Sequence, residues 1–344
     1  MNKKLIMDGT AIQPTNSQLQ VLGIFNPAVI DFQDGIIMIA RVAEQAIQDE
    51  DEFFKVPTFH PSHGIKVMKI SKNDPAYDFK DARVIKNGKT SYLTSISHLR
   101  IGKSIDGVHF DFDSFAPLIP QNQYEEYGLE DPRITKINDD YMITYTAVSR
   151  FGITVRLLKT RDFIEYIDLG NIFHSDNKDC VIFPTQVNGK YFALHRPSIS
   201  QFGQPDIWTA QSDNLTEWGN HQIMEQARVN YMSCSRVGAG AVPFLTEEGW
   251  IVIYHCADEY NRYHLACLLL DKNNPNHVLK RSKSPLVEPT ESYETKGFMN
   301  DVVFTCGLIQ NKQEISIYYG ACDERIAMCT LTVKEIYDNL EVIL

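Results

Sequence analysis

The sequence predicts an all-β protein, and within that class a five-bladed β-propeller that takes up the whole chain, residues 1–344, as one domain. Three observations lead to this prediction. A hairpin pattern recurs five times, a second strand-and-turn pattern follows several of the hairpins, and helical periodicity is almost absent. Units of about 40–55 residues with four short strands each are typical of propeller blades. A β-sandwich lacks such a repeated pair of patterns.

The hairpin pattern is an apolar run, a turn rich in Asp, Asn, Glu or Gly, and a second apolar or aromatic run. This order of residue types predicts two antiparallel strands. The five predicted hairpins are 26–42, 131–148, 181–196, 241–255 and 302–320. Their turns are Asp34-Gly35, Asn138–Asp140, Asn188-Gly189, Glu247–Gly249 and Asn311-Lys312.

The second pattern is a strand, a small or hydroxyl residue, a turn that contains Asp, and then an aromatic or apolar residue. It is found in 99–110, 156–166 and 207–218, with a more degenerate copy in 268–278. The turn aspartates are 51 to 58 residues apart and are Asp106, Asp162, Asp213 and Asp271. The recurrence of both patterns predicts the same strand arrangement in successive blades.

Two segments depart from the strand pattern. Residues 44–64 are polar, contain two prolines and have four consecutive acids, 49–52. We expect them to form a loop on the rim of the propeller that contacts substrate or a neighbouring subunit, because long ordered loops are usually functional. Residues 333–340 have apolar side chains at helical spacing, which predicts a short C-terminal helix.

The composition limits the classes of function. The net charge of −11 argues against nucleic acid, which needs a basic surface, and more weakly against an anionic membrane. No apolar stretch reaches the roughly 18 residues of a membrane span, and the N-terminal apolar run is too short for a signal peptide. The seven cysteines, none in a CxxC pair, are expected to be buried thiols of a cytoplasmic protein and not disulfides or zinc ligands. The ten histidines show no spacing that predicts a metal site.

Polar residues begin the predicted inner strand of each blade, where an apolar residue would be the ordinary choice. In a propeller these positions line the axial funnel, the usual place for a ligand. The positions are Asn26, Asp131, Lys178-Asp179, 238–240 and Asn300-Asp301.

The run Glu130-Asp131-Pro132-Arg133 is the clearest candidate for acid catalysis. Pro132 is expected to hold Asp131 in an extended conformation. Repulsion between the adjacent carboxylates would raise the pKa of one of them, as a general acid requires, and Arg133 could keep the other ionised. The alternative interpretation is a turn at a strand entry with a surface ion pair.

A second set of candidates is cationic. Lys178, Arg196, Arg236 and His255 lie at or near strand ends in an otherwise acidic chain. Any one of them could be an ordinary surface or core residue, but together they could form an anion site. Inverting hydrolysis needs two carboxylates, whereas a phosphate nucleophile is already anionic and needs no base. One carboxylate and a cationic cluster would then be sufficient.

The chain also resembles glycoside hydrolase family 130, the β-mannoside phosphorylases and related mannosidases, over nearly its full length. The resemblance lies in the segments 26–28, 41–44, 128–133, 178–184, 191–197, 238–243, 249–255 and 318–323. It departs at Cys256, where the family often has Gly, and at 299–301, where it often has Pro-Asn.

The resemblance implies a five-bladed propeller with Asp131 as the proton donor, acting on the glycosidic oxygen through the mannose 3-hydroxyl. The implied phosphate-binding residues are Arg100, Lys178, Arg196, His255 and Tyr263. The expected substrate-binding residues are Asn26, Arg41, Glu130, Arg133, Asp179, His195 and Asp323. Inorganic phosphate would be a co-substrate, with no cofactor and no metal.

The stretches 97–100, 124–127 and 147–150 most resemble the branch of the family that acts on β-1,2-linked mannobiose and mannooligosaccharides. The resemblance therefore implies an inverting phosphorylase that releases α-mannose 1-phosphate. It also suggests a homodimer or a larger homo-oligomer.

Four alternatives stay open at this point. Two are enzymes of the same fold, namely a phosphorylase of β-1,4-mannosyl-glucose or β-1,4-mannooligosaccharides and a β-mannosidase that uses water. The third is a sugar-binding propeller without catalysis. The last is a five-bladed glycosidase with three acids, which Asp131, Asp179 and Asp301 could imitate.

Overall fold

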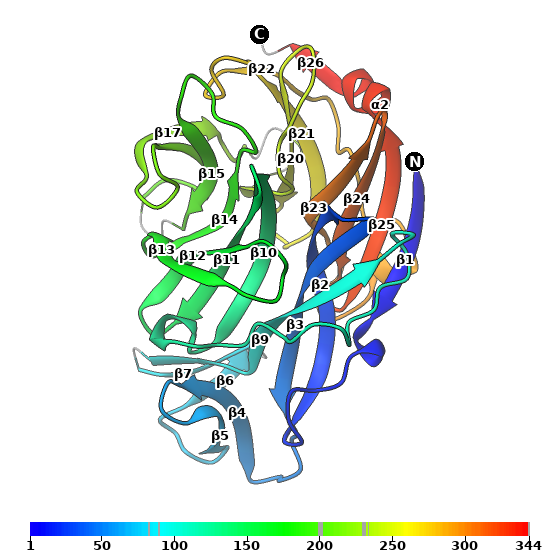
Figure 1. Cartoon of the computed structure of the whole chain (residues 1–344). Coiled ribbons are helices and arrows are strands. Elements are labelled where there is room, and N and C mark those ends of the chain that lie inside the picture. The colour runs from blue at the N-terminus through cyan, green and yellow to red at the C-terminus, as the bar shows by residue number, and fades with distance from the viewer. Residues whose placement is uncertain (82, 89, 199–201, 229–231, 233, 343–344) are drawn as a thin grey trace.

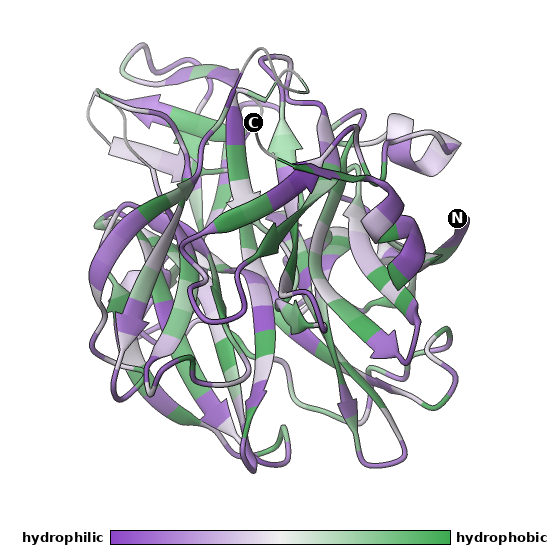
Figure 2. Ribbon diagram, turned by 90° about the horizontal axis from the view of Figure 1, so that it is seen from above, coloured by the Kyte–Doolittle hydropathy of each residue, from purple (hydrophilic) through white to green (hydrophobic). Residues whose placement is uncertain are grey.

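The computed structural model describes residues 1–81, 83–88, 90–198, 202–228, 232 and 234–342, and nearly all of its regular elements are strands (Figure 1). The all-β prediction is therefore confirmed. Hydrophobic bands concentrate on the strands, while many connecting loops are hydrophilic (Figure 2). This pattern is the one expected when side chains alternate between two faces of a sheet.

Three of the sheets consist of consecutive antiparallel strands. The first has the order β14 (Asn177–Ile182), β15 (Tyr191–Pro197), β16 (Ile207–Ser212) and β17 (Gly219–Glu225). The second has the order β18 (Arg236–Ala239), β20 (Trp250–Ala257), β21 (Tyr263–Leu270), β22 (Val278–Ser282) and β26 (Leu340–Val342), with β19 (Phe244–Leu245) also paired to β20. The third contains β23 (Val303–Asn311), β24 (Glu314–Ala321), β25 (Arg325–Thr332) and, at its edge, β1 (Asn2–Asp8).

The longest sheet joins two antiparallel groups. One group is β2 (Leu19–Phe32), β3 (Gly35–Ala46) and β9 (Ser95–Ser104), and the other is β10 (Gly128–Ile137), β11 (Asp140–Ser149), β12 (Gly152–Thr160) and β13 (Ile167–Phe173). The only register pair between β9 and β10 in the described part of the chain is Gly128 with Ser97. A Cβ atom on Gly128 would lie 2.3 Å from the Ser97 carbonyl oxygen, so glycine permits this junction.

The prediction of a loop at 44–64 is wrong. Strand β3 continues to Ala46, and the polar segment then forms the hairpin of β4 (Phe53–His60) and β5 (Gly64–Ser71). A three-stranded sheet follows, made of β6 (Asp78–Asp81), β7 (Val84–Asn87) and β8 (Thr90–Leu93). The small hydrophobic cluster of Val56, Ile70 and Ile85 joins the two sheets. The polar composition had hidden the alternation of a half-buried hairpin.

Helices are few and short in the described residues. They are α1 (Ser292–Thr295), α2 (Val333–Asp338) and the 3₁₀ turns η1 (Gly9–Ala11) and η2 (Gln123–Glu125). Helix α2 starts with a capping box between Thr332 and Glu335 and ends two residues before the predicted end at 340, because Leu340 begins β26. No helix in this part of the chain has the length and apolar character needed to cross a bilayer.

Candidate active site

Four of the predicted inner-strand residues, Asn26, Asp131, Lys178 and Asp179, meet in a polar pocket of about 150 Å³, whereas 238–240 and Asn300-Asp301 do not line it. Its walls come from residues of β2, β10, β14 and β18, together with residues from other strands and from the turn before β7. The lining residues are Asn26, Arg41, Arg83, Asp131, Lys178, Asp179, Arg196, Arg236, Asn261, Tyr263, Met299, Val302, Phe304 and Asp323. The pocket therefore combines carboxylates with basic side chains and has an apolar side at Met299, Val302 and Phe304.

The same local irregularity presents three of these side chains. Asn26, Asp131 and Asp179 have φ angles of 50°, 48° and 53°, and each sits where the pairing of its strand shifts register. A β-bulge re-aims a side chain, and Asn and Asp tolerate the left-handed conformation better than other non-glycine residues. The expectation that Pro132 would hold Asp131 extended is wrong, because the left-handed bulge at Asp131 overrides the preference of the residue before proline.

Asp131 is a buried carboxylate held by two neighbours. Asn26 donates a hydrogen bond to Oδ1 from Nδ2 over 2.8 Å, and the Arg41 guanidinium lies 3.3 Å from the same oxygen. Arg41 also pairs with Glu130 at 2.8 Å. The adjacent carboxylates are thus bridged by Arg41, whereas the sequence had pointed to Arg133.

The raised pKa that a general acid requires is not found at Asp131. Burial acts to raise the pKa of Asp131, but the charges of Arg41, Lys178 and Arg133 and the Asn26 hydrogen bond outweigh it, so the pKa lies below its usual value. The carboxyl with a raised pKa is Asp323, at about 6. Burial is the main cause, and repulsion from Asp131 and Glu130 adds to it.

Asp179 is the centre of a buried ion network. Its carboxylate lies 3.0 Å from Arg196, 3.3 Å from His255 and 3.4 Å from Arg133. Burial alone would raise the pKa of Asp179, yet Arg196, His255 and Arg133 hold it well below the usual value. Asp179 is therefore a permanent anion that fixes Arg196 and not a candidate base.

Basic groups line the side of the pocket near β14, β15 and β21. Arg196 is fixed through one guanidinium nitrogen by Asp179, and its Nε is buried with no hydrogen-bond partner among the described residues. Arg236 donates to the Tyr263 hydroxyl over 2.7 Å and to Asn261 over 2.7 Å. Lys178 also lines the pocket. These groups can bind an anion without moving far.

His255 differs from its predicted role as a cation. It is fully buried behind Asp179 and Arg196 and does not line the pocket. Burial lowers the pKa of His255 to about 4, so the imidazole is neutral at pH 7. It supports the Asp179–Arg196 pair from behind.

The structure does not bring two further predicted residues to the pocket. Arg100 donates to His98 and to the Gln13 carbonyl. His195 stacks on Phe173 at 4.4 Å and contacts His221 at 3.1 Å.

Two others lie beneath the pocket without lining it. Arg133 donates to the Asp131, Ala239 and Gly240 carbonyls, and so ties strands together. Glu130 contacts Arg41.

Some lining residues were missed by the sequence analysis. Arg83 comes from the insertion between β3 and β9, beyond the predicted loop of 44–64, and nothing in its local pattern signals a site. Asn261 has a φ of 63°, which a turn Asn predicts, but its hydrogen bond with Arg236 needs the fold. Phe304 and Met299 look like ordinary core residues in the sequence. Among the described residues, one group could hold a metal, namely the buried Cys234 and Cys256 with the partly buried His264.

Comparisons with known proteins identify the family of the chain. The model of glycoside hydrolase family 130, described as beta-1,4-mannooligosaccharide phosphorylase, matches residues 82–342. A beta-1,2-mannobiose phosphorylase of Listeria innocua is 41% identical over 336 residues, which cover 96% of this chain and 95% of that protein. A 1,2-beta-oligomannan phosphorylase of Thermoanaerobacter sp. is 37% identical over 248 residues, 71% of this chain and 82% of that protein.

A solved structure gives the same result. The Listeria innocua beta-1,2-mannobiose phosphorylase in complex with beta-1,2-mannobiose matches with a TM-score of 0.94 and 39% sequence identity, covering 98% of this chain and 99% of that one. Both the family model and the near full-length relative identify the chain. It belongs to glycoside hydrolase family 130.

Proposed function

We propose that the chain is an inverting phosphorylase that cleaves β-1,2-mannobiose and β-1,2-mannooligosaccharides with inorganic phosphate and releases α-mannose 1-phosphate. The observation that carries this proposal is the division of the pocket into two parts. One mobile proton can be held by Asp131, and several fixed cations face the same small space. The near full-length relative supports the linkage, because it is a beta-1,2-mannobiose phosphorylase.

The reaction follows from this division. A phosphate oxygen held by Lys178, Arg196 and the Tyr263 hydroxyl attacks the anomeric carbon of the mannosyl residue. The bond from that carbon to the glycosidic oxygen breaks, and this oxygen takes a proton that originates on Asp131, relayed by the mannose 3-hydroxyl. Asp131 ends as a carboxylate that Asn26 and Arg41 stabilise.

The low pKa of Asp131 is compatible with an acid role if phosphate binding raises it. The nearby positive charges lower the pKa. A bound phosphate anion would offset those charges and add its own repulsion, so it would favour the protonated carboxyl. Phosphate binding would thus favour protonation of Asp131, which prepares it to act as the acid.

A β-mannosidase is the second candidate, and the geometry disfavours it. Inverting hydrolysis needs a carboxylate base in addition to the acid. Asp179 is occupied by Arg133, Arg196 and His255. Asp301, the third acid of the three-acid alternative, lines a neighbouring cleft and not this pocket.

We also propose that the sheets form a five-bladed propeller. Five hydrophobic clusters support it, each shared by two neighbouring groups of strands. They join β2–β9 to β10–β13, β10–β13 to β14–β17, β14–β17 to β18–β22, β18–β22 to β23–β25, and β23–β25 back to β2–β9. The last cluster returns to the first group, as a closed ring of blades requires.

The inner strands give a second argument for a ring. Residues earlier along these strands line the polar pocket, and residues further along line a separate apolar pocket, with contributions from β2, β10, β23 and the segments after β14 and β18. Five inner strands around one axis would share one pocket at each end in this way. The cytoplasmic location and the homo-oligomeric state stay predictions, the first supported by seven free buried cysteines.

The experiment that tests the substrate assignment is a panel of disaccharides. Purified protein is incubated with phosphate and β-1,2-mannobiose, β-1,4-mannobiose or β-1,4-mannosyl-glucose, and mannose 1-phosphate is measured. The proposal expects kcat/KM to be highest for the β-1,2 linkage, by at least about 100-fold. A preference for a β-1,4 linkage, as in the family description, would overturn the linkage and keep the reaction class.

A further inference from the structure

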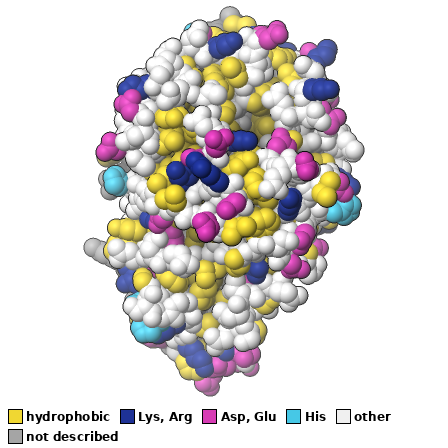
Figure 3. Space-filling view, viewed as in Figure 1, with side chains coloured by type: hydrophobic (Ala, Val, Ile, Leu, Met, Phe, Trp, Pro, Cys, Tyr) yellow, Lys and Arg dark blue, Asp and Glu magenta, His cyan; other side chains and the backbone are white. Residues whose placement is uncertain are grey.

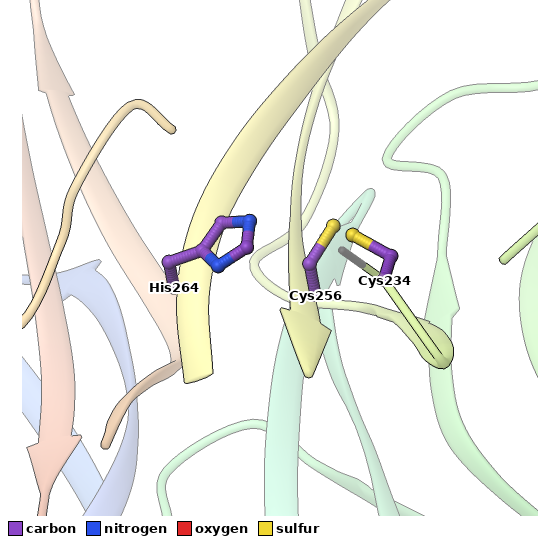
Figure 4. A group of neighbouring side chains, drawn as sticks. All are labelled: Cys234, Cys256 and His264. Carbon is purple, nitrogen blue, oxygen red and sulfur yellow. The ribbon is translucent and has the colours of Figure 1, made fainter. Parts of the chain in front are cut away.

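Three soft metal ligands meet outside the active site. Cys234 precedes β18, Cys256 lies in β20 and His264 lies opposite it in β21, as its register partner. Their ligand atoms all lie within 4.8 Å of one another. Figure 4 shows the two sulfurs side by side and the imidazole of His264 facing them. The residues are 22 and 8 positions apart along the chain (256 − 234 and 264 − 256), so the fold and not the local sequence assembles them.

The trio lies behind the active pocket. Cys256 follows His255, and His264 follows Tyr263. Neighbouring side chains on a strand point to opposite faces of the sheet, so the trio faces away from the phosphate side. Cys234 and Cys256 are buried in the core cluster shared by β14–β17 and β18–β22. The proposed phosphorolysis has no use for these side chains.

The donor set fits a thiophilic cation. Two thiols and one imidazole are the ligands that Zn²⁺ takes in many protein sites. Zinc–sulfur bonds of about 2.3 Å and a zinc–nitrogen bond of about 2.0 Å put tetrahedral ligand atoms roughly 3.5–3.8 Å apart. The three atoms would have to approach by about 1 Å at most, which side-chain rotation can supply.

Two further observations point to a ligand. Nε2 of His264 is a buried atom with no conventional hydrogen-bond partner in the described part of the chain, and buried polar atoms usually have one. Both cysteines are free thiols. His264 also lines a polar cleft of about 520 Å³ with Met232, Asp258 and Arg262. That cleft would give a metal ion a way in and would have room for water at the fourth position.

We propose that Cys234, Cys256 and His264 form a binding site for one Zn²⁺ ion, with water as the fourth ligand. The ion fastens the segment before β18 to strands β20 and β21. Arg236 is two residues after Cys234 and Tyr263 is next to His264, so the ion would also fix the backbone that carries the hydrogen-bonded pair Arg236–Tyr263. The site is structural and separate from the reacting atoms.

Cobalt binding tests the proposal, because thiolate-bound Co²⁺ has a sulfur-to-metal charge-transfer absorption in the near ultraviolet. The full chain is reduced with a phosphine, freed of metal with a chelator and titrated with Co²⁺. We expect one Co²⁺ per chain with this absorption, and its complete loss when Zn²⁺ is added. Cys234→Ser, Cys256→Ser and His264→Gln should each weaken Co²⁺ binding by at least about 100-fold.

Cys267→Ser is the matched control. Cys267 is also a buried cysteine of β21, but its sulfur contacts Ser282 at 3.1 Å and lies outside the trio. This variant should bind Co²⁺ like the wild type. His264→Gln keeps the test possible if a buried cysteine variant fails to fold, because His264 is only partly buried.

Two results would overturn the site. One is the absence of the charge-transfer absorption in the fully reduced wild type, and the other is an affinity for Co²⁺ that none of the three substitutions changes. The readout is absorption and not phosphorolysis, so failure of the zinc site and failure of the proposed reaction are distinguishable.

Discussion

At the scale of single residues, the carboxyl groups of the pocket differ in the cations that neutralise them. Asp179 is held by Arg196, Asp131 is held by Asn26 and Arg41, and Asp323 has no ion pair among the described residues and a raised pKa. The three carboxyls therefore differ in charge behaviour although they line one small space. Differences of this kind are what separate an acid from a binding group in an active site.

Phosphate should raise the pKa of Asp131. The charges of Arg41 and Lys178 now depress that pKa, and an anion bound among the same cations acts in the opposite direction. We expect the basic limb of the pH profile of kcat/KM for the sugar to move to higher pH as phosphate goes from limiting to saturating. A limb that does not move would contradict the coupling.

Asp323 should set the acidic limb of the pH profile of KM for the sugar. Its pKa of about 6 means that it becomes protonated as the pH falls from 7 to 5, and a neutral carboxyl is a weaker acceptor for sugar hydroxyls. KM for the sugar should therefore rise over this range, and Asp323→Asn should have a high KM without that pH dependence. An unchanged acidic limb in the variant would assign it to another group.

The same residue should cost stability at neutral pH. A carboxyl with a folded pKa of about 6 and an ordinary value of 3.8 binds more protons in the folded state between these pH values. Stability is then lost as the pH rises from about 4 to 6, by up to about 3 kcal/mol. Asp323→Asn should raise the Tm at pH 7.5 and lose that advantage near pH 4, which thermal unfolding at the two pH values would check.

Arg196 should bind phosphate and not sugar. Its fork is pre-oriented by Asp179, and lysine cannot reproduce a bidentate contact. We expect Arg196→Lys to raise KM for phosphate by about 10- to 100-fold with little change in KM for the sugar. Arg262→Lys, at an exposed guanidinium that pairs with Asp258, is the matched control and should leave both KM values unchanged.

At the scale of elements, the hairpins were predictable and their irregularities were not. All five predicted hairpins are present, because their turns carry strong local signals such as Asp34-Gly35 and Asn188-Gly189. The bulges at Asn26, Asp131 and Asp179 could not be predicted, since they depend on pairing with strands far along the chain. These bulges are what point the side chains into the pocket.

The second repeated pattern is present, but the aspartates of its turns do not all make the same contacts. Oδ1 of Asp106 accepts hydrogen bonds from the next turn amides, as does Oδ1 of Asp162. In the third copy that role belongs to Asn214, while Asp213 pairs with Lys190. Asp and Asn both form such turns, so the sequence alone did not distinguish the neighbours.

Gly238 in β18 should be intolerant of any side chain. A Cβ at this position would lie 2.3 Å from Asp179 Oδ2 and 2.4 Å from His255 Nε2. Gly238→Ala should therefore displace the buried ion network, lower the free energy of unfolding by about 1–3 kcal/mol and abolish most phosphorolysis. Gly219→Ala, where a Cβ meets nothing within 4 Å, should leave both unchanged, and equal effects in the two variants would contradict the packing argument.

At the scale of the whole molecule, the N-terminal strand joins a sheet formed near the other end of the chain. Strand β1 pairs with β25 at the edge of the β23–β25 sheet, whereas the last strand, β26, pairs with β22 (Figure 1). Nothing in the first eight residues predicts this partner, because the pairing spans more than 300 residues. Acidic and basic side chains intermingle over one face (Figure 3).

Lys3 should make the main electrostatic interaction that holds β1 in this position. It pairs at 2.7 Å with Glu294, whose side chain is fully buried and also accepts from Tyr319. Lys3→Met would leave a buried charge unpaired and should lower the free energy of unfolding at pH 7 by about 3–5 kcal/mol. Lys334→Met, which breaks an exposed pair with Asp338, should cost less than about 1 kcal/mol.

The pKa of Glu294 determines how the effect of Lys3→Met on the free energy of unfolding changes with pH. The Lys3 and Tyr319 hydrogen bonds hold the pKa of Glu294 below its usual value despite burial, so its contribution is present above about pH 4.5 and is lost as the pH falls. The penalty of Lys3→Met should shrink under acid, and chemical denaturation at pH 7 and pH 4 would check it. A penalty that does not depend on pH would mean that lost packing, and not charge, is the cause.

The most direct test of the proposed function is ³¹P NMR of the protein with β-1,2-mannobiose and inorganic phosphate. We expect the phosphate signal to convert to that of α-mannose 1-phosphate, and no free sugar to be released when phosphate is left out. Asp131→Asn should slow the conversion by at least about 100-fold. Release of mannose without phosphate, or a full rate in Asp131→Asn, would contradict the proposed function.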